Sequence, residues 1–74
     1  MMVNKTYIVY QNVVVKQEMV GYNNNVEMAV IVRRVKAKSE AEAIGKFILN
    51  TSNEIYQQKL EPCCIELTNL KLIE

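Results

Sequence analysis

The chain contains no histidine, a single proline and only two glycines among its 74 residues. Without histidine it lacks the side chain that most often serves as general acid or base at neutral pH. The sequence also contains neither a glycine-rich phosphate loop nor a Gly-x-Ser-x-Gly nucleophile motif. These absences argue against an enzyme, and we expect no catalytic residue and no cofactor.

Cysteine is almost as scarce, and the two that occur, Cys63 and Cys64, are adjacent. Neighbouring side chains in a strand point to opposite faces, so a disulfide between them would be strained. Two thiolates without histidine fall short of a tetrahedral zinc site unless carboxylates or a second chain complete it. We therefore predict one cysteine in the core, one outside and no metal site, with vicinal redox or metal chemistry as the alternative.

A strong charge of either sign is lacking too, since the formal net charge is +1. No global field draws such a chain to nucleic acid or to an anionic membrane. The longest apolar runs, such as Met28 to Val32, are far too short to span a bilayer, and the first residues lack the order of a secretion signal. We expect a cytoplasmic protein without a membrane contact.

What the sequence does contain is hydrophobic residues, which make up 50% of the chain. This composition predicts one compact domain over residues 1–74. A domain of this size buries only about 60% of its unfolded surface. Chains this short commonly need a covalent cross-link, a bound metal or a partner that covers apolar surface in order to be stable.

Two long stretches have the β-branched and aromatic composition of strands. The first runs from Lys5 to Val20, either as one strand or as two strands split at Gln11-Asn12. The segment Gly21–Asn25 has the residues of a hairpin loop. The second strand is predicted from Val26 to Lys38.

The second strand carries apolar side chains on both of its faces, which indicates burial on both sides. A bulge at Arg33-Arg34 is the alternative, because it would bring the apolar residues to a single face. The residues of one face are Val26, Met28, Val30 and Val32, and those of the other are Ala29, Ile31, Val35 and Ala37.

A helix is predicted to start at Ser39, a good N-cap with Glu42 at the spacing of a capping box. From Glu40 the apolar period changes to that of a helix, and the stretch 50–53 is where it ends or bends. The predicted apolar stripe comprises Ala41, Ile44, Ile48, Thr51 and Ile55, with Ala43 and Phe47 beside it.

After Pro62 the alternation of Cys63, Ile65 and Leu67 predicts a last strand, half-buried against the helix. An apolar tail, Leu70, Leu72 and Ile73, is expected to pair along the same edge or to pack on a neighbour. The order strand, strand, helix, strand predicts an α+β fold. Its three-stranded antiparallel sheet has the spatial order second, first, third, with one helix packed on one face. A four-stranded version, with the first segment split, is the alternative.

The junction Val35–Ala43, with the pattern Val-x-Ala-x-Ser-x-x-Glu-Ala, resembles that of many small α+β domains, including short phage and mobile-element proteins. The resemblance covers nine residues and is shared by any capped strand-to-helix turn. It identifies no family and implies no site.

One helix can cover only one side of a sheet, so an apolar sheet face is left over. We therefore predict a non-enzymatic protein-binding or regulatory module that occupies a partner's surface, one form of which is an inhibitor of the phage or mobile-element type. A symmetric dimer is the commonest way to cover such a face. The candidate interface residues are Ile8, Tyr10, Val14, Met28, Val30 and Val32.

The alternative is a small nucleic-acid-binding domain that uses the basic second strand. Charges on an edge strand also have a purely protective role, since they prevent indiscriminate pairing. The candidate contacts of this alternative are Lys16, Arg33, Arg34, Lys36 and Lys38.

Overall fold

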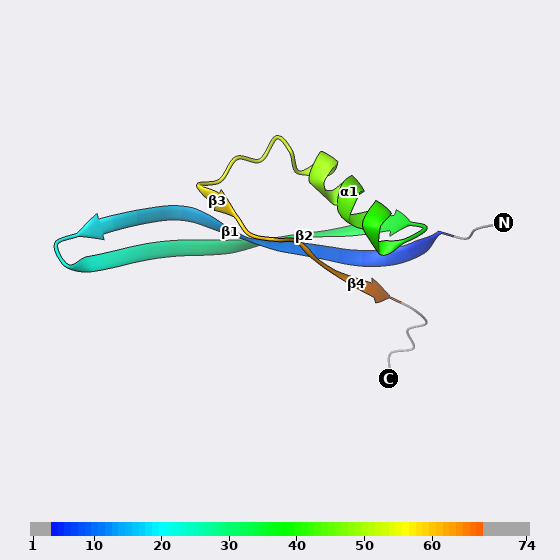
Figure 1. Ribbon diagram of the computed structural model, residues 1–74, viewed down its shortest axis with the longest axis horizontal. Coiled ribbons are helices and arrows are strands. Elements are labelled where there is room, and N and C mark those ends of the chain that lie inside the picture. Colours follow the sequence, from blue (N-terminus) through cyan, green and yellow to red (C-terminus); the bar gives the residue numbers. More distant parts are fainter. Residues whose placement is uncertain (1–3, 68–74) are drawn as a thin grey trace.

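The computed structural model describes residues 4–67 and shows an α+β fold with an antiparallel sheet and one helix (Figure 1). The predicted apolar tail at Leu70, Leu72 and Ile73 lies outside the described residues. The elements are β1 (Lys5–Val20), β2 (Asn23–Ala37), α1 (Glu40–Asn50), β3 (Gln58–Lys59) and β4 (Cys63–Leu67).

Strands β1 and β2 form one long antiparallel hairpin. Its turn is shorter than the predicted loop, because Asn23 to Asn25 already belong to β2 and only Gly21 and Tyr22 connect the strands. Gly21 has a φ of 62°, a left-handed conformation that glycine adopts without steric cost. Gln11 and Asn12 pair with Ile31 and Val30, so β1 is a single strand.

The register of this hairpin changes once, between Val14 and Lys16. Val14 is opposite Met28 and Lys16 is opposite Glu27, which leaves Val15 as the extra residue of a β-bulge. The alternative bulge at Arg33-Arg34 is wrong, since both arginines keep the regular pairing with β1.

Within residues 4–67 the sheet already has four strands, and the predicted number of three is therefore wrong. As expected, the last strand, β4, lies beside β1 on the edge opposite β2. The additional strand, β3, pairs with Val13 and Val14 further along the same edge. It does not come from a split of the first segment. It is a strand of two residues in the segment after the helix, and two residues are too few to show a strand pattern in the sequence.

Helix α1 begins as the sequence predicts and ends at Asn50. Ser39 Oγ accepts a hydrogen bond from the Glu42 N–H at 3.2 Å, and the Glu42 carboxylate accepts one from the Lys38 N–H at 2.7 Å. The Glu42 side chain thus accepts from the backbone N–H of the residue before the N-cap, and not from that of the N-cap residue itself. Among residues 4–67 no helix has the length and apolarity needed to cross a membrane.

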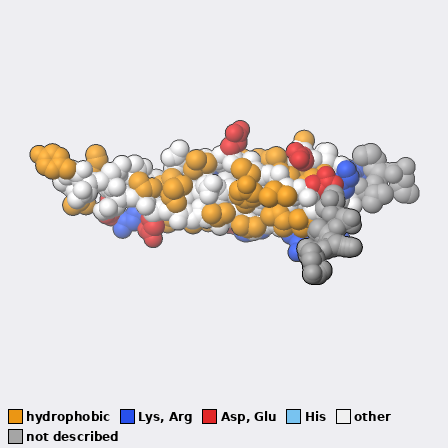
Figure 2. All heavy atoms as spheres, turned by 90° about the horizontal axis from the view of Figure 1, so that it is seen from below, with side chains coloured by type: hydrophobic (Ala, Val, Ile, Leu, Met, Phe, Trp, Pro, Cys, Tyr) orange, Lys and Arg blue, Asp and Glu red, His pale blue; other side chains and the backbone are white. Residues whose placement is uncertain are grey.

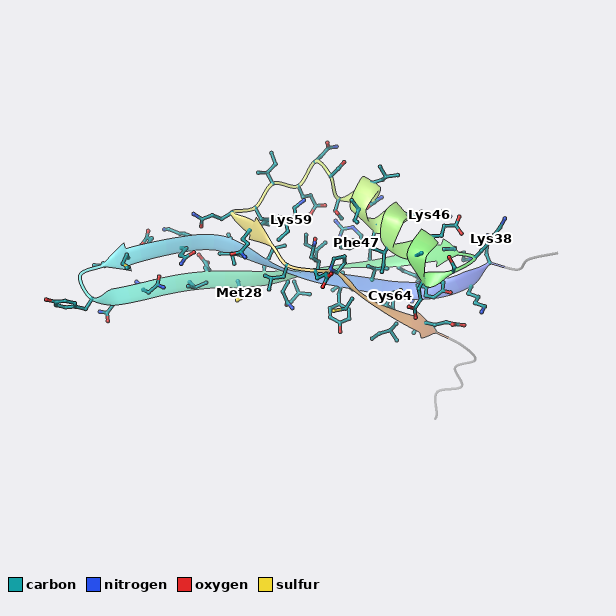
Figure 3. All side chains as sticks on the ribbon, viewed as in Figure 1. Met28, Lys38, Lys46, Phe47, Lys59 and Cys64 are labelled. Atoms are coloured by element: carbon teal, nitrogen blue, oxygen red, sulfur yellow. The ribbon has the colours of Figure 1, made fainter. Side chains whose placement is uncertain are left out.

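A small buried cluster joins the helix to the sheet. Ala43 and Phe47 are completely buried, and Figure 3 shows Phe47 between α1 and the strands. The predicted stripe was wrong in its phase, since Ile48 is 51% and Ile55 is 88% exposed. Because the helix ends before Thr51, residues beyond it cannot extend a helical stripe. The strand members of the cluster are Tyr7, Val9, Val13, Ile31 and Ala37.

These strand residues define one side of the sheet, which we call the cluster face. The opposite side, which carries the alternate residues of each strand, is the open face. Residues directly opposite each other in a ladder share a face, so the pairing with β1 assigns every residue of β2 and β4. Figure 1 shows α1 on one side of the sheet only.

Beyond β3 the hairpin continues as a two-stranded ribbon, the hairpin arm, in which every residue from Val15 to Val30 is exposed. The molecule is consequently long and narrow, with extents of 58 × 31 × 14 Å. Its radius of gyration is 16.0 Å, whereas a compact chain of this length has about 11 Å. A two-stranded ribbon is at best marginally stable in water by itself.

The Ser39 cap predicts a loss of stability in Ser39→Ala, by about 1 kcal/mol, because the Glu42 N–H loses its acceptor. Chemical denaturation followed by circular dichroism measures it. Ser39→Asp keeps an acceptor at the cap and should stay within a few tenths of a kcal/mol of the wild type. Equal midpoints for wild type and Ser39→Ala would show that the cap does not hold the helix.

The Lys38 N–H lowers the pKa of Glu42, with a smaller contribution from the charge of Lys46. A lowered folded-state pKa stabilises the protein above the unfolded carboxyl pKa of about 4.3, and the stabilisation disappears as the pH falls through the folded value. Glu42→Gln should therefore be less stable than wild type at neutral pH, with the difference shrinking in acid. Glu61→Gln is the control, since Glu61 has no hydrogen bond or ion pair within residues 4–67. A difference that is independent of pH would contradict this assignment.

Candidate protein interface

The open face of the sheet is lined by apolar side chains from three strands. Register assigns to it Ile8 and Tyr10 of β1, which are opposite Ile65 and Cys63 of β4. From β2 it receives Met28, Val30 and Val32, which are 54%, 54% and 51% exposed. Ile65 is likewise 51% exposed. Figure 2 looks onto this side of the molecule, where hydrophobic side chains gather along the middle.

The contrast between the two faces is sharp along a single strand. Ile31 is 5% exposed, while its neighbours Val30 and Val32 are about half exposed. The same alternation runs along β1, where Val9 is completely buried and Ile8 and Tyr10 are partly exposed. The open face is thus exposed to solvent although its side chains are as apolar as those of a buried surface. Contiguous apolar patches of this kind mark interaction sites.

The predicted interface residues are distributed unevenly with respect to solvent. Ile8 and Tyr10 are half-buried and lie between β2 and β4, and Met28, Val30 and Val32 are exposed. Val14 is only 6% exposed and offers little surface to a partner.

The apolar row extends into the hairpin arm beyond the bulge. Val26 is opposite Gln17 and Asn24 is opposite Met19, and both pairs follow Met28 on the open face. Met19 is 72% and Val26 is 47% exposed. The open face therefore runs from the arm to the end of the sheet that carries β4.

Charge is almost absent from the open face. The register places only Arg34 and Lys36 on it, at the end beside β4, and neither has an ion-pair partner within residues 4–67. Glu66 is opposite Tyr7 and so belongs to the cluster face, where it forms an ion pair with Lys5 at 3.7 Å.

The basic residues of the alternative hypothesis do not come together in one strip. Arg33 lies on the cluster face and donates to the Glu54 carboxylate at 2.6 Å, whereas Arg34 and Lys36 lie on the open face. Lys16 is 2.9 Å from Glu18 on the arm. Its ladder partner, Glu27, is about 20 Å from Arg33 along β2. Lys38 follows the end of β2.

The outer edge of β2 is closed at two points by side chains. The carbonyl of Asn12 accepts from the Leu60 N–H and that of Val14 from the Gln57 N–H, so even-numbered residues of β1 direct their backbone groups away from β2. Their partners on β2 consequently direct theirs to the outer edge. There Arg33 Nη1 donates to the Val32 carbonyl at 3.0 Å and Lys46 Nζ to the Lys36 carbonyl at 2.8 Å. These contacts hinder the addition of another strand at this edge.

The two cysteines occupy opposite faces, as neighbours in a strand should. Cys64 packs against the buried cluster, and burial raises the pKa of its thiol, with Glu40 and Glu66 adding to the effect. Cys63 is exposed on the open face, where a hydrogen bond with it raises the pKa of Tyr10. Within the described part of the chain no three His, Cys, Asp or Glu residues gather as a metal site.

Cys63 and Ile65 were not predicted as surface residues, because the last strand was expected to turn this side toward the helix. Its pairing with β1 decides otherwise, since Ile65 lies opposite Ile8. The exposed Cys63 and half-buried Cys64 could not be told apart from composition. The glutamate at position 66 pointed to the wrong side, because a carboxylate indicates the solvent side of a strand, whereas Glu66 shares the side of Cys64 and pairs with Lys5.

Comparison of the chain with protein families, with curated proteins and with solved structures yields no match.

The different surroundings of the thiols predict that Cys63 is alkylated well before Cys64 in the native protein, because Cys63 is exposed and the thiolate of Cys64 is disfavoured. Iodoacetamide labelling followed by peptide mass spectrometry measures both rates. Cys63→Ser should leave only the slow thiol and Cys64→Ser only the fast one. Native rates as similar as those in denaturant would contradict the placement of Cys64.

Proposed function

We propose that this protein is a small, non-enzymatic protein-binding module that acts by covering an apolar surface of another protein chain with its open face. The observation that carries the proposal is the row of half-exposed valine, isoleucine and methionine side chains on a sheet face to which residues 4–67 contribute only two charges. Binding of this kind is how a small inhibitor or regulatory subunit occupies the surface of its partner.

The free energy gained by covering the open face favours association with another protein chain. Burying a whole Val, Ile or Met side chain contributes about 1.5–3 kcal/mol, so covering the exposed halves contributes on the order of 1 kcal/mol each. Association costs about 4–15 kcal/mol in lost freedom. Several side chains must therefore be covered together, which a continuous row along one flat face allows.

The carboxylates support a non-enzymatic role, because structural contacts account for most of those in the described residues. Glu42 caps the helix, Glu54 binds Arg33, Glu66 lies near Lys5 and Glu18 lies near Lys16.

Nucleic acid is less well supported than protein as the partner. Arg33 and Lys46 are near the carboxylates of Glu54 and Glu42, which offset their charge. The arm carries one lysine and two glutamates, Lys16, Glu18 and Glu27. Binding led by phosphate contacts needs a set of unopposed cations and weakens steeply with salt.

The test compares wild type with Val32→Glu, which places a charge in the centre of the open face. Ile55→Glu is the matched control, because Ile55 is 88% exposed and lies outside the sheet. Each protein is purified under native conditions from the cells that make it. Sedimentation velocity gives the mass of the species, and mass spectrometry gives its composition.

We expect wild type and Ile55→Glu to sediment as a protein complex of defined stoichiometry, and Val32→Glu as a folded chain of 8.5 kDa. Wild type at the mass of one chain, or a complex that Val32→Glu leaves intact, would refute the proposal. Retention on single- or double-stranded oligonucleotides that falls steeply with added salt would favour the nucleic-acid alternative instead.

A further inference from the structure

The open face offers several partly exposed apolar side chains to one partner. Met28, Val30, Val32 and Ile65 are each 51–54% exposed, and Met19 and Val26 on the arm are 72% and 47% exposed. A stable interface of standard size buries about 800 Å² on each partner, so these side chains have to be covered together.

We propose that a second copy of this chain covers the open face, so that two sheets pack face to face with their strands antiparallel about a two-fold axis that crosses the strands near Val30. The inference rests on the proposed function and names its partner. Sheets packed in this way are about 10 Å apart, and their inner side chains interdigitate.

The open face is suited to a copy of itself because its apolar row extends to both sides of Val30. Toward the arm lie Met28 and Val26, and toward the other end lie Val32 and the pair Ile8 and Ile65. A two-fold axis at Val30 places Met28 of one copy over Val32 of the other. Each apolar half is then covered by the opposite half of its mate, which is the self-complementarity that an isologous interface requires.

The face is a better site for the second copy than the edge of the sheet. Edge-to-edge pairing of two β2 strands would need their outward backbone groups, and the Val32 and Lys36 carbonyls already accept from Arg33 and Lys46. Edge pairing would also leave both open faces uncovered. Face-to-face packing removes the apolar surface and leaves these hydrogen bonds intact.

The two charges on the face select the antiparallel arrangement. A two-fold axis along the strands would bring Arg34 and Lys36 of both copies to one end of the interface, where the strands of the described chain place no carboxylate on the open face. Four cations would then repel one another at the margin of a dry contact. An axis across the strands separates the two pairs to opposite ends, where Arg34 of one copy lies over Val26 of the other and Lys36 over Asn24.

The same arrangement gives the hairpin arm the support that it lacks in one chain. The arm of each copy lies over the end of the other sheet, where Ile65 is exposed and Ile8 is half-buried. Met19 and Val26 on the arm then pack against a surface instead of water. A ribbon that is marginal by itself becomes one layer of a two-layer structure.

Sedimentation equilibrium of the purified full-length chain tests the dimer. We expect twice the chain mass of 8.5 kDa for wild type and for Ile55→Glu, and the mass of one chain for Val30→Glu. Circular dichroism checks that Val30→Glu is folded, and Val30→Thr, which keeps the shape of valine, should weaken the dimer less.

Two distance measurements test the arrangement. Spin labels on Tyr22→Cys, in a chain without Cys63 and Cys64, report the separation of the arm tips in the dimer. Strands antiparallel about Val30 place the tips about 50 Å apart, whereas parallel strands place them within about 20 Å. If the cysteine-free chain does not fold, a mixture of ¹³C-labelled and unlabelled wild type should show an interchain contact between the Met28 methyl group and Val32.

The outcomes separate this inference from the proposed function. A purified monomer that forms a Val32→Glu-sensitive complex with another protein overturns the second copy as the occupant and leaves the proposed function standing. A dimer whose tips lie together overturns the antiparallel arrangement. A full-length monomer that dimerises once residues 68–74 are removed would assign the open face to that segment instead.

Discussion

Strand β1 is the element on which the rest of the structure depends, because it forms the backbone ladders to β2, β3 and β4. Its side chains alternate between Tyr7 and Val9 in the core and Ile8 and Tyr10 on the opposite side. Since every other strand takes its register from β1, this single alternation decides which side of the whole sheet is packed by Phe47 and which remains open.

Local patterns were sufficient for the features that a short stretch of sequence determines alone. The Ser39 cap, the long first strand and the two apolar series of β2 all follow from spacing and composition, and the structure contains each of them. The open face was also predictable, because it needs only two alternating strands and one helix. Its residues at Met28, Val30 and Val32 were assigned correctly to one side.

The errors concern features that depend on contacts distant in sequence. Strand β3 exists because Gln58 and Lys59 meet Val13 and Val14, and two residues carry no pattern of their own. The helix stripe was shifted because the stop at Asn50 removes Ile55 from the helical surface and leaves Phe47 to fill the core. The side of β4 that faces outward follows from Ile8 lying opposite Ile65, which composition does not specify.

The extra residue at Val15 changes which residues of β1 lie on the open face in the arm. Before it, even-numbered residues of β1 share the side of Ile8, and after it odd-numbered residues do, so Met19 replaces Glu18 on that side. Deletion of Val15 would leave every other pairing unchanged, whereas if Val15 instead paired with Glu27 and the bulge were lost, Lys16 and Glu18 would move to the apolar side and break its continuity. Residues added or removed in matched pairs on both strands would lengthen or shorten the arm without this effect, so the arm tolerates changes of length only in even steps.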